Sequence, residues 1–251
     1  MSGLAWLARR ETLRVSKLWT QTVLAPVIAS ILFILVFGLS LGGRIDHVGG
    51  IDYEVFIVPG LLTMAMAQAA YANNASSVFQ ARFDRYINDV LSAPMPSWQM
   101  CVGFVIGGVF RALAIGLSLL VLAALLVDLP VAQPFALITA VALGLLLFAS
   151  LGLVVGIYAE SWDFTTFINN IVILPLVFVG GVFYSVDVLP SPWEELSHFN
   201  PVFYLVNAVR FGFLGESDVG IGLSLAVIAA LALPAFLWAQ YLFRSGRRLK
   251  P

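Results

Sequence analysis

The chain carries few residues of the types that perform enzymatic chemistry. Its two lysines, Lys17 and Lys250, do not follow a glycine run, so the sequence lacks the phosphate-binding loop by which many ATPases hold a nucleotide. Its single cysteine, Cys101, excludes an intramolecular disulfide and a cysteine-based metal site. No nucleophile triad or carboxylate pair supports a membrane enzyme such as a lipid-modifying transferase. We therefore expect no catalytic residue, no metal ion and no cofactor on this chain.

Polar residues inside apolar stretches are more informative. Arg111 lies about 11 residues into an apolar stretch, near mid-depth, where a charge costs at least about 2.5–3.5 kcal/mol. It should face other helices or a wet cavity, and it either binds an anionic substrate headgroup or bonds to helix-end carbonyls. Amide side chains in two other stretches either form interhelical hydrogen bonds or line a substrate path. These amides are Gln68, Asn73, Asn74, Asn169 and Asn170.

Glu160 and Asp163 stand three residues apart, at the end of another apolar stretch. Such a pair could couple transport to protons. At a membrane interface, however, carboxylates are readily solvated, so we favour charges at a helix end.

The composition shows what kind of element must position these residues. Hydrophobic residues make up 61% of the 251 residues, against 45–50% in soluble domains, and charged residues only 11% against about 25%. A soluble domain is excluded, and the chain is an all-α integral membrane protein with one domain over residues 1–251. Six apolar stretches can cross the roughly 30 Å hydrocarbon core. They are Val23–Leu41, Val55–Tyr71, Met100–Val127, Phe135–Tyr158, Phe164–Tyr184 and Ile221–Phe243.

The basic residues predict the orientation. They gather before the first stretch, between the second and third, and after the sixth, while the remaining loops hold only Arg44 and Arg210 against nine acids, Asp46 among them. By the positive-inside rule both termini are cytoplasmic, which requires an even number of crossings. The segment around Phe203–Leu214 is then a re-entrant or interfacial piece on the outer side. A formal net charge of −1 gives no indication of nucleic-acid binding.

Residues 3–20 have the pattern of an amphipathic helix in the inner membrane interface. Apolar residues fall within one arc of about 120°, with Glu11 as the exception inside it. Arg10, Arg14 and Lys17 lie beside the arc and should contact anionic headgroups. The alternative is a basic flank that only sets the topology.

The loop between the second and third stretches predicts a short amphipathic helix, ended by Pro94 and Pro96. It is either a solvated loop helix or a docking lever, whose aromatic residues fill a partner's pocket while mixed charges set its orientation. Its apolar face holds Phe79, Phe83, Tyr86, Ile87 and Val90, and its charges are Arg82, Asp84, Arg85 and Asp89.

Three segments together resemble the ABC-2 type permeases, the membrane subunits of exporters whose ATPase is a separate polypeptide. The C-terminal segment runs Phe178–Ser185 (FVGGVFYS), followed by Leu189-Pro190, Trp193, Phe199-Asn200-Pro201, Tyr204 and Arg210. Phe56–Leu61 (FIVPGL) is similar to the start of the family's second span, and residues 81–96 are similar to its coupling-helix loop. The resemblance covers nearly the whole chain, with the YadH-like branch nearest and the NodJ-type permeases more distant.

The resemblance implies an architecture and partners. It implies six spans, an interface helix over residues 3–20, a coupling helix over 79–92 that contacts the ATPase, and two re-entrant outer helices within 186–216. It also implies a dimer of this chain over two cytoplasmic ATPase subunits, which bind ATP and Mg²⁺, in the bacterial inner membrane. Spans one, two and five would line the dimer seam and the export path of an amphipathic substrate such as a lipid, a glycan or a drug-like molecule.

The other interpretation is a stand-alone secondary transporter or channel. It requires titratable or ion-binding groups at the midplane, where only Arg111 qualifies. The sequence leaves open the identity of the substrate and the choice between homodimer and heterodimer.

Overall fold

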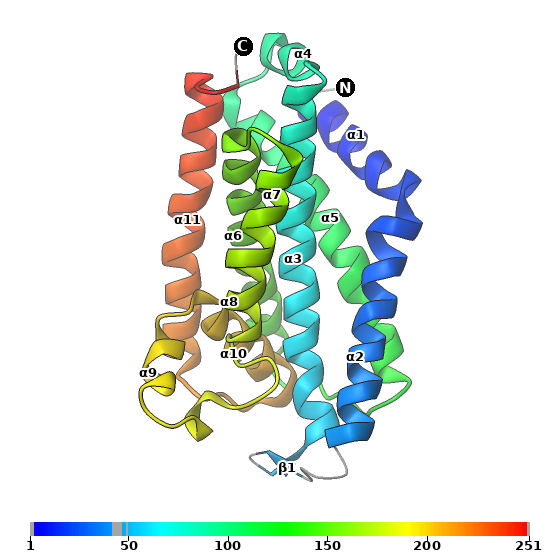
Figure 1. Ribbon diagram of the computed structural model, residues 1–251, viewed down its shortest axis with the longest axis vertical. Coiled ribbons are helices and arrows are strands. Elements are labelled where there is room, and N and C mark those ends of the chain that lie inside the picture. Colours follow the sequence, from blue (N-terminus) through cyan, green and yellow to red (C-terminus); the bar gives the residue numbers. More distant parts are fainter. Residues whose placement is uncertain (1–2, 42–46, 49, 250–251) are drawn as a thin grey trace.

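The computed structural model describes residues 3–41, 47–48 and 50–249 as an elongated helical bundle (Figure 1). Among these described residues, four helices are long and apolar enough to cross a membrane, and a bent helix pair at the N-terminal end makes a fifth candidate. The six predicted spans are thus not all continuous helices of spanning length. The four long helices are α3 (Tyr53–Phe83), α5 (Ser97–Ala124), α6 (Pro134–Tyr158) and α11 (Ile221–Ser245).

The N-terminal segment is two helices with a sharp bend. Helix α1 (Gly3–Lys17) meets the following helix at 76°, and that helix consists of a π-helical turn η1 (Thr20–Leu24) and α2 (Ala25–Leu41). Helix α1 packs along α5, where Gly103 and Gly107 permit close approach: a Cβ atom on Gly103 would lie 2.6 Å from Leu7 Cδ2. The close packing of α1 on α5 therefore stabilises the bend between α1 and α2.

Helix α3 forms the centre of the bundle and packs on α5 and α6. On α6, a Cβ atom on Gly152 would lie 2.3 Å from Tyr71 O and one on Gly156 would lie 2.6 Å from Ala75 O, so only glycine fits at either position. The sequence predicts the end of this span at Tyr71, but α3 continues to Phe83. It does so because neighbouring helices provide partners for its polar residues, as described below.

The predicted coupling helix over residues 79–92 is not one helix. Helix α3 ends at Phe83, a turn over 84–86 follows, and α4 (Ile87–Ser92) is a separate short helix. Arg85 in the turn has φ of 64°, a left-handed conformation that interrupts the helix. We call residues 79–92 the coupling segment below.

The fifth predicted span is one helix that is shorter than predicted and contains a π-helical turn. It comprises α7 (Trp162–Ile168), a π-helical turn η2 (Asn169–Ile173) and α8 (Leu174–Phe178), and it ends at Phe178 instead of Tyr184. Pro175 has no N–H to donate to the preceding turn, which is consistent with the wide turn there. After Phe178 the chain turns at Gly181, whose φ of 75° suits glycine.

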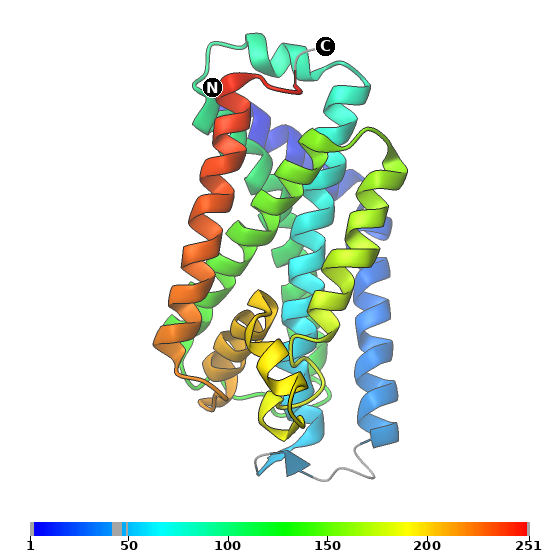
Figure 2. The same ribbon diagram turned by 60° about the vertical axis from the view of Figure 1, so that its left-hand side comes forward.

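Short elements occupy the end of the bundle opposite α4 (Figures 1 and 2). They include the antiparallel strands β1 (His47–Val48) and β2 (Ile51–Asp52), which the all-α prediction missed. They also include the 3₁₀ turn η3 (Val186–Val188), α9 (Trp193–His198) and α10 (Pro201–Leu214), and α10 packs on α3, α6 and α11. The first turn of α1 and the last turn of α11 both lie at the α4 end of the bundle. Arg44 and Asp46 lie outside the described residues.

Candidate functional site

The tip of the coupling segment presents charged and aromatic side chains to the surroundings. Phe83, Asp84, Arg85 and Asp89 are exposed, with Phe83 at 69%. The opposite side of α4 is anchored, since Ile87 and Val90 belong to the buried core. Because one side of α4 is anchored in the core, the exposed side chains are held in a defined orientation in which they can contact a partner protein.

Two predicted contact residues of the coupling segment are engaged within the chain. Phe79 is buried against Trp162, with ring centroids 4.7 Å apart in an edge-to-face arrangement. Arg82 Nη1 donates to Gly156 O at 3.0 Å and Ala159 O at 2.8 Å, so its guanidinium satisfies carbonyls at the end of α6. Both side chains fix the end of α3 to its neighbours.

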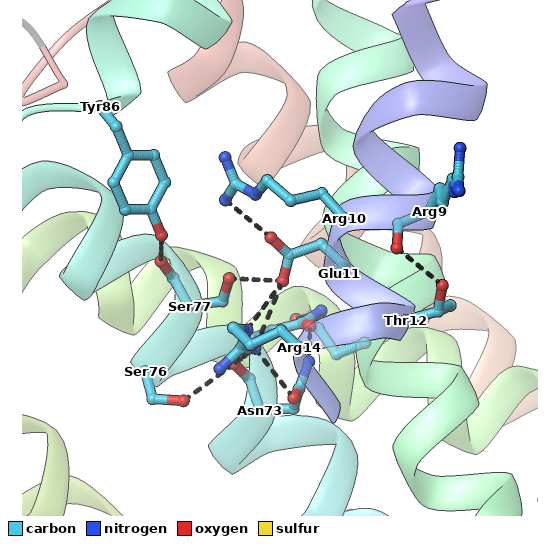
Figure 3. Close-up of polar contacts among 11 residues, drawn as sticks. Arg9, Arg10, Glu11, Thr12, Arg14, Asn73, Ser76, Ser77 and Tyr86 are labelled. Atoms are coloured by element: carbon cyan, nitrogen blue, oxygen red, sulfur yellow. Dashed lines mark hydrogen bonds and ion pairs between the residues drawn. The ribbon is translucent and has the colours of Figure 1, made fainter. Parts of the chain in front are cut away.

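A buried carboxylate joins α1 to α3, and Figure 3 shows its surroundings. Glu11 has no exposed surface, and it accepts hydrogen bonds from Arg10 Nη2 at 2.8 Å, Arg14 Nε at 3.3 Å and Ser77 Oγ at 2.6 Å. Arg14 Nη2 also donates to Asn73 Oδ1 at 3.0 Å. We call these five residues the Glu11 cluster.

The Glu11 cluster extends to the coupling segment and to α6. The Arg10 guanidinium lies over the Tyr86 ring at 4.3 Å, and the Tyr86 hydroxyl donates to Ser77 O at 3.5 Å. Burial raises the pKa of that hydroxyl, which keeps it protonated. In the other direction, Asn73 donates to Asn74 Oδ1 at 3.2 Å and Asn74 donates to Ala149 O of α6 at 3.1 Å.

This differs from the expectation that the basic residues of α1 all contact headgroups. Arg10 and Arg14 turn towards Glu11 because its carboxylate needs counter-charges inside the protein, while Lys17 is exposed. The sequence marked Glu11 only as an exception on the apolar arc of α1. The sequence did contain a signal for this cluster: an acidic residue on the apolar face of α1, with arginines one and three residues away.

Three of the polar residues considered for the substrate path line one pocket of about 410 Å³ between α2, α3, α5 and the helix over 162–178. These three residues are Gln68, Arg111 and Asn169, and Ser30 adds a further polar side chain to the lining. Within the described part of the chain, Gln68 Nε2 and Asn169 Oδ1 are buried without a hydrogen-bond partner. Aromatic and aliphatic side chains supply much of the remaining wall, including Phe33, Leu61, Met64, Leu174 and Phe178.

Arg111 lies halfway along α5, close to the bend between α1 and η1. It follows Gly107 by one turn, and a Cβ atom on Gly107 would lie 2.7 Å from the Cβ of Glu11. Its Nε donates to Thr22 O in η1 at 3.0 Å. Among the described residues it has no acidic partner within ion-pair distance.

The other amides considered for the path, Asn73, Asn74 and Asn170, lie elsewhere, and Asn74 bonds to Ala149 O as described above. Asn73 belongs to the Glu11 cluster, and Asn170 is exposed, where its Oδ1 accepts from Asn169 Nδ2 at 3.1 Å. Over residues 3–41, 47–48 and 50–249, no three His, Cys, Asp or Glu side chains are grouped so that they could hold a metal ion.

A second polar cluster, which the sequence did not predict, lies among the short elements at the far end. Arg210 Nη2 donates to Gly181 O at 2.7 Å, its Nη1 lies 3.7 Å from Asp218 Oδ2, and its guanidinium stacks on Phe56 at 3.9 Å. Asp218 also accepts from Ser185 Oγ at 3.0 Å. We call Arg210, Asp218, Ser185 and Gly181 the Arg210 cluster.

Asn207 of α10 stabilises the Arg210 cluster by hydrogen bonds to the loop that contains Asp218. Its Oδ1 accepts from Asp218 N at 2.7 Å, and its Nδ2 donates to Val219 O and Ser224 Oγ, both at 2.9 Å. Nearby, burial and the charge of Asp218 raise the pKa of Asp187. The cluster therefore ties α10 to the loops on either side of it.

Comparison with known proteins agrees with the resemblance noted in the sequence. Residues 3–214 match the family model described as ABC-2 type transporter. The inner membrane transport permease YadH of Escherichia coli K12 is 36% identical, and the alignment covers 100% of both chains. Nodulation protein J of Rhizobium leguminosarum bv. viciae is 28% identical over 98% of this chain and 96% of its own, and that of Rhizobium meliloti is 26% identical over 100% and 96%. The chain belongs to the ABC-2 type transporter family, as a membrane permease.

Proposed function

We propose that this permease is the transmembrane subunit of an exporter that moves an amphipathic substrate outwards across the bacterial inner membrane. Hydrolysis of Mg²⁺-bound ATP in a separate cytoplasmic ATPase subunit drives the transport. The observation that carries the proposal is the full-length similarity to an inner membrane transport permease. The exposed coupling segment supports it, because the energy must enter the membrane subunit from a soluble partner.

The proposed assembly is a homodimer of this chain over two ATPase subunits. Six crossings would be made by η1 with α2, by α3, α5 and α6, by the helix over 162–178, and by α11. Helices α9 and α10 would be the re-entrant pair at the outer end, with both termini cytoplasmic. The basic residues near α4, α1 and the end of α11 support this orientation.

The proposed docking surface for the ATPase is the exposed tip of the coupling segment. Phe83 would enter an apolar pocket of the partner, and Asp84, Arg85 and Asp89 would set its orientation. Phe79, Arg82 and Tyr86 would carry the movement inwards, because they contact α7, α6 and α1. Rotation of the segment as a rigid body would then reorient α3 against the dimer seam.

The proposed substrate path includes the pocket of Gln68, Arg111 and Asn169. A cation and two amides at one end, with aromatic and aliphatic walls beyond, suit an amphiphile whose anionic headgroup lies near Arg111. The two amide atoms without a partner support this, because a bound headgroup would satisfy them.

The first test is co-purification of the ATPase with Arg85→Glu. Arg85 is exposed, whereas reversal of Arg82 would also break its bonds to α6. We expect the wild type, extracted in mild detergent, to retain a stoichiometric ATPase, and the variant to retain at most about a tenth, which corresponds to about 1.4 kcal/mol of binding. The measurement is quantitative mass spectrometry of the tagged complex.

Arg247→Glu is the matched control, because it makes the same charge change at an exposed position on the same end. It should retain the ATPase. Wild-type protein that contains no ATPase, and that still moves a substrate in liposomes without ATP, would contradict the proposal and favour a secondary transporter.

The second test is Arg111→Gln in the reconstituted complex. We expect export of an anionic lipid probe to fall by about tenfold or more, since a charge-assisted contact contributes about 1.5–3 kcal/mol. Arg111→Lys should retain part of the activity. Equal export by wild type and Arg111→Gln, with folding unchanged, would exclude Arg111 from headgroup binding.

A further inference from the structure

We propose that Glu11 is a positioning residue that makes α1, the coupling segment and the adjoining half of α3 move as one body during transport. This rests on the proposed function, because it concerns how movement of the coupling segment reaches the membrane helices. Glu11 touches neither the pocket residues nor the exposed tip of the coupling segment, so its part in transport would be indirect.

The first argument is the origin of the hydrogen bonds around the carboxylate. Two donors come from Arg10 and Arg14 on α1 itself, and the third, Ser77 Oγ at 2.6 Å, comes from α3. The Arg14 guanidinium also reaches Asn73 of α3. A charged carboxylate without water is stable only while these donors stay in place, so separation of α1 from α3 would expose an unpaired charge.

The second argument is that a glycine on α5 provides the space in which the polar side chains of α1 and α3 meet. Helix α1 packs along α5, and Gly107 of α5 lies beneath the cluster. A Cβ atom there would lie 2.7 Å from the Cβ of Glu11 and 3.3 Å from Asn73 Nδ2. The missing side chain on α5 therefore allows the polar groups of α1 and α3 to meet.

The third argument is that the coupling segment enters the same cluster. Tyr86 stacks under Arg10 at 4.3 Å and bonds to the Ser77 carbonyl of α3 at 3.5 Å. Displacement of Tyr86 therefore acts on α1 and α3 together. If the ion pairs of Glu11 only held α1 in place, contact with Tyr86 of the coupling segment would not be needed.

The functional test separates ATP hydrolysis from transport in the reconstituted permease–ATPase complex. Glu11→Gln keeps the size of the side chain but removes its charge. We expect transport per ATP hydrolysed to fall by about tenfold, a typical coupling between two sites, while the amount of bound ATPase and its rate stay within about twofold. Ser77→Ala, which keeps the charge, should give a smaller loss.

Arg9→Gln is the matched control. Arg9 neighbours Arg10 on α1 but is exposed and directed away from the cluster in Figure 3. It should transport like the wild type. Glu11→Asp, which restores the charge on a shorter side chain, should recover part of the coupling. Normal transport per ATP in Glu11→Gln would overturn the proposal.

A distance measurement tests the single body directly and does not depend on how well Glu11→Gln folds. Replacement of Cys101, the only cysteine, by alanine gives a background for spin labels. One labelled pair joins Ser16 on α1 to Ser92 on α4, and the other joins Ser92 to Ser245 on α11; all three positions are exposed. Distances are recorded by pulsed electron paramagnetic resonance in the complex, without nucleotide and with ATP and vanadate.

We expect the Ser16–Ser92 distance to stay constant and the Ser92–Ser245 distance to change with nucleotide. A change in both distances would overturn the role of Glu11 while leaving a moving coupling segment. No change in the Ser92–Ser245 distance would instead contradict the rigid-body movement in the proposed function, and the role of Glu11 with it.

Discussion

The Glu11 and Arg210 clusters lie at opposite ends of the bundle and pair buried acids with arginines in opposite ways. In the Glu11 cluster the acid is fully buried, and the side chains of Arg10 and Arg14 are 25% and 23% exposed. In the Arg210 cluster the arginine is the buried member, with 3% of its side chain exposed against 11% for Asp218. The first cluster joins two helices, α1 and α3, whereas the second joins α10 to the loops on either side of it.

This difference decides what happens when one charge is removed. Without Glu11, both arginines lie near enough to the surface to turn towards water. Without Asp218, Arg210 stays between Phe56 and the Gly181 carbonyl, where water cannot replace the lost charge. We infer that the Glu11 cluster is suited to transmit movement and that the Arg210 cluster is suited to hold one end of the molecule closed.

Asp218→Ala should therefore have the largest effect on stability. It leaves a buried guanidinium without a counter-charge and removes acceptors for Ser185 Oγ and Val186 N. We expect a loss of about 3–5 kcal/mol in the free energy of unfolding, as for other broken buried pairs. The measurement is an unfolding titration of the purified permease in mixed detergent micelles.

Asp218→Asn is the control for charge. Its side-chain oxygen can still accept from Ser185, so the loss should be clearly smaller than for alanine. If both variants unfold like the wild type, the ion pair at 3.7 Å contributes nothing and the comparison fails.

Glu11→Ala should have an intermediate effect, about 1–3 kcal/mol, because Ser77 loses an acceptor while Arg10 and Arg14 gain water. The same titration measures it. A loss larger than that of Asp218→Ala would show that the two arginines cannot reach water, which would reverse the order of the two clusters.

The third and sixth are among the spans that the sequence located well, although the third contains Arg111. The third and sixth were predicted as Met100–Val127 and Ile221–Phe243, and α5 and α11 agree within three residues at each end. The second span was predicted too short by twelve residues at its C-terminal end, because a prediction from hydropathy ends a span where polar residues begin. In the fold, Asn73, Asn74 and Ser77 have partners on α1 and α6, so the helix continues.

The candidate site was harder to predict because its partners are distant in sequence. Glu11 and Ser77 are 66 residues apart, and Arg82 meets carbonyls 74 and 77 residues away. Periodicity places a side chain on a face of its own helix but says nothing about which helix lies opposite. The cluster of Gln68, Arg111 and Asn169 in one pocket shows that polar residues in apolar runs were the most useful signal.

Glu160→Gln should have the smallest effect and calibrates the comparison. Glu160 Oε1 lies 3.8 Å from Arg248 Nη1, but the two side chains are 85% and 49% exposed, so water already solvates both charges. Exposed pairs contribute about 0–1 kcal/mol, and we expect a change within about 0.5 kcal/mol in the same titration. Asp163→Asn, three residues away in sequence, removes the charge of the other carboxylate as the matched control, and export by both variants should equal that of the wild type. A marked loss of export in Glu160→Gln alone, with stability unchanged, would mean that this carboxylate takes part in transport, as a proton-coupled mechanism requires.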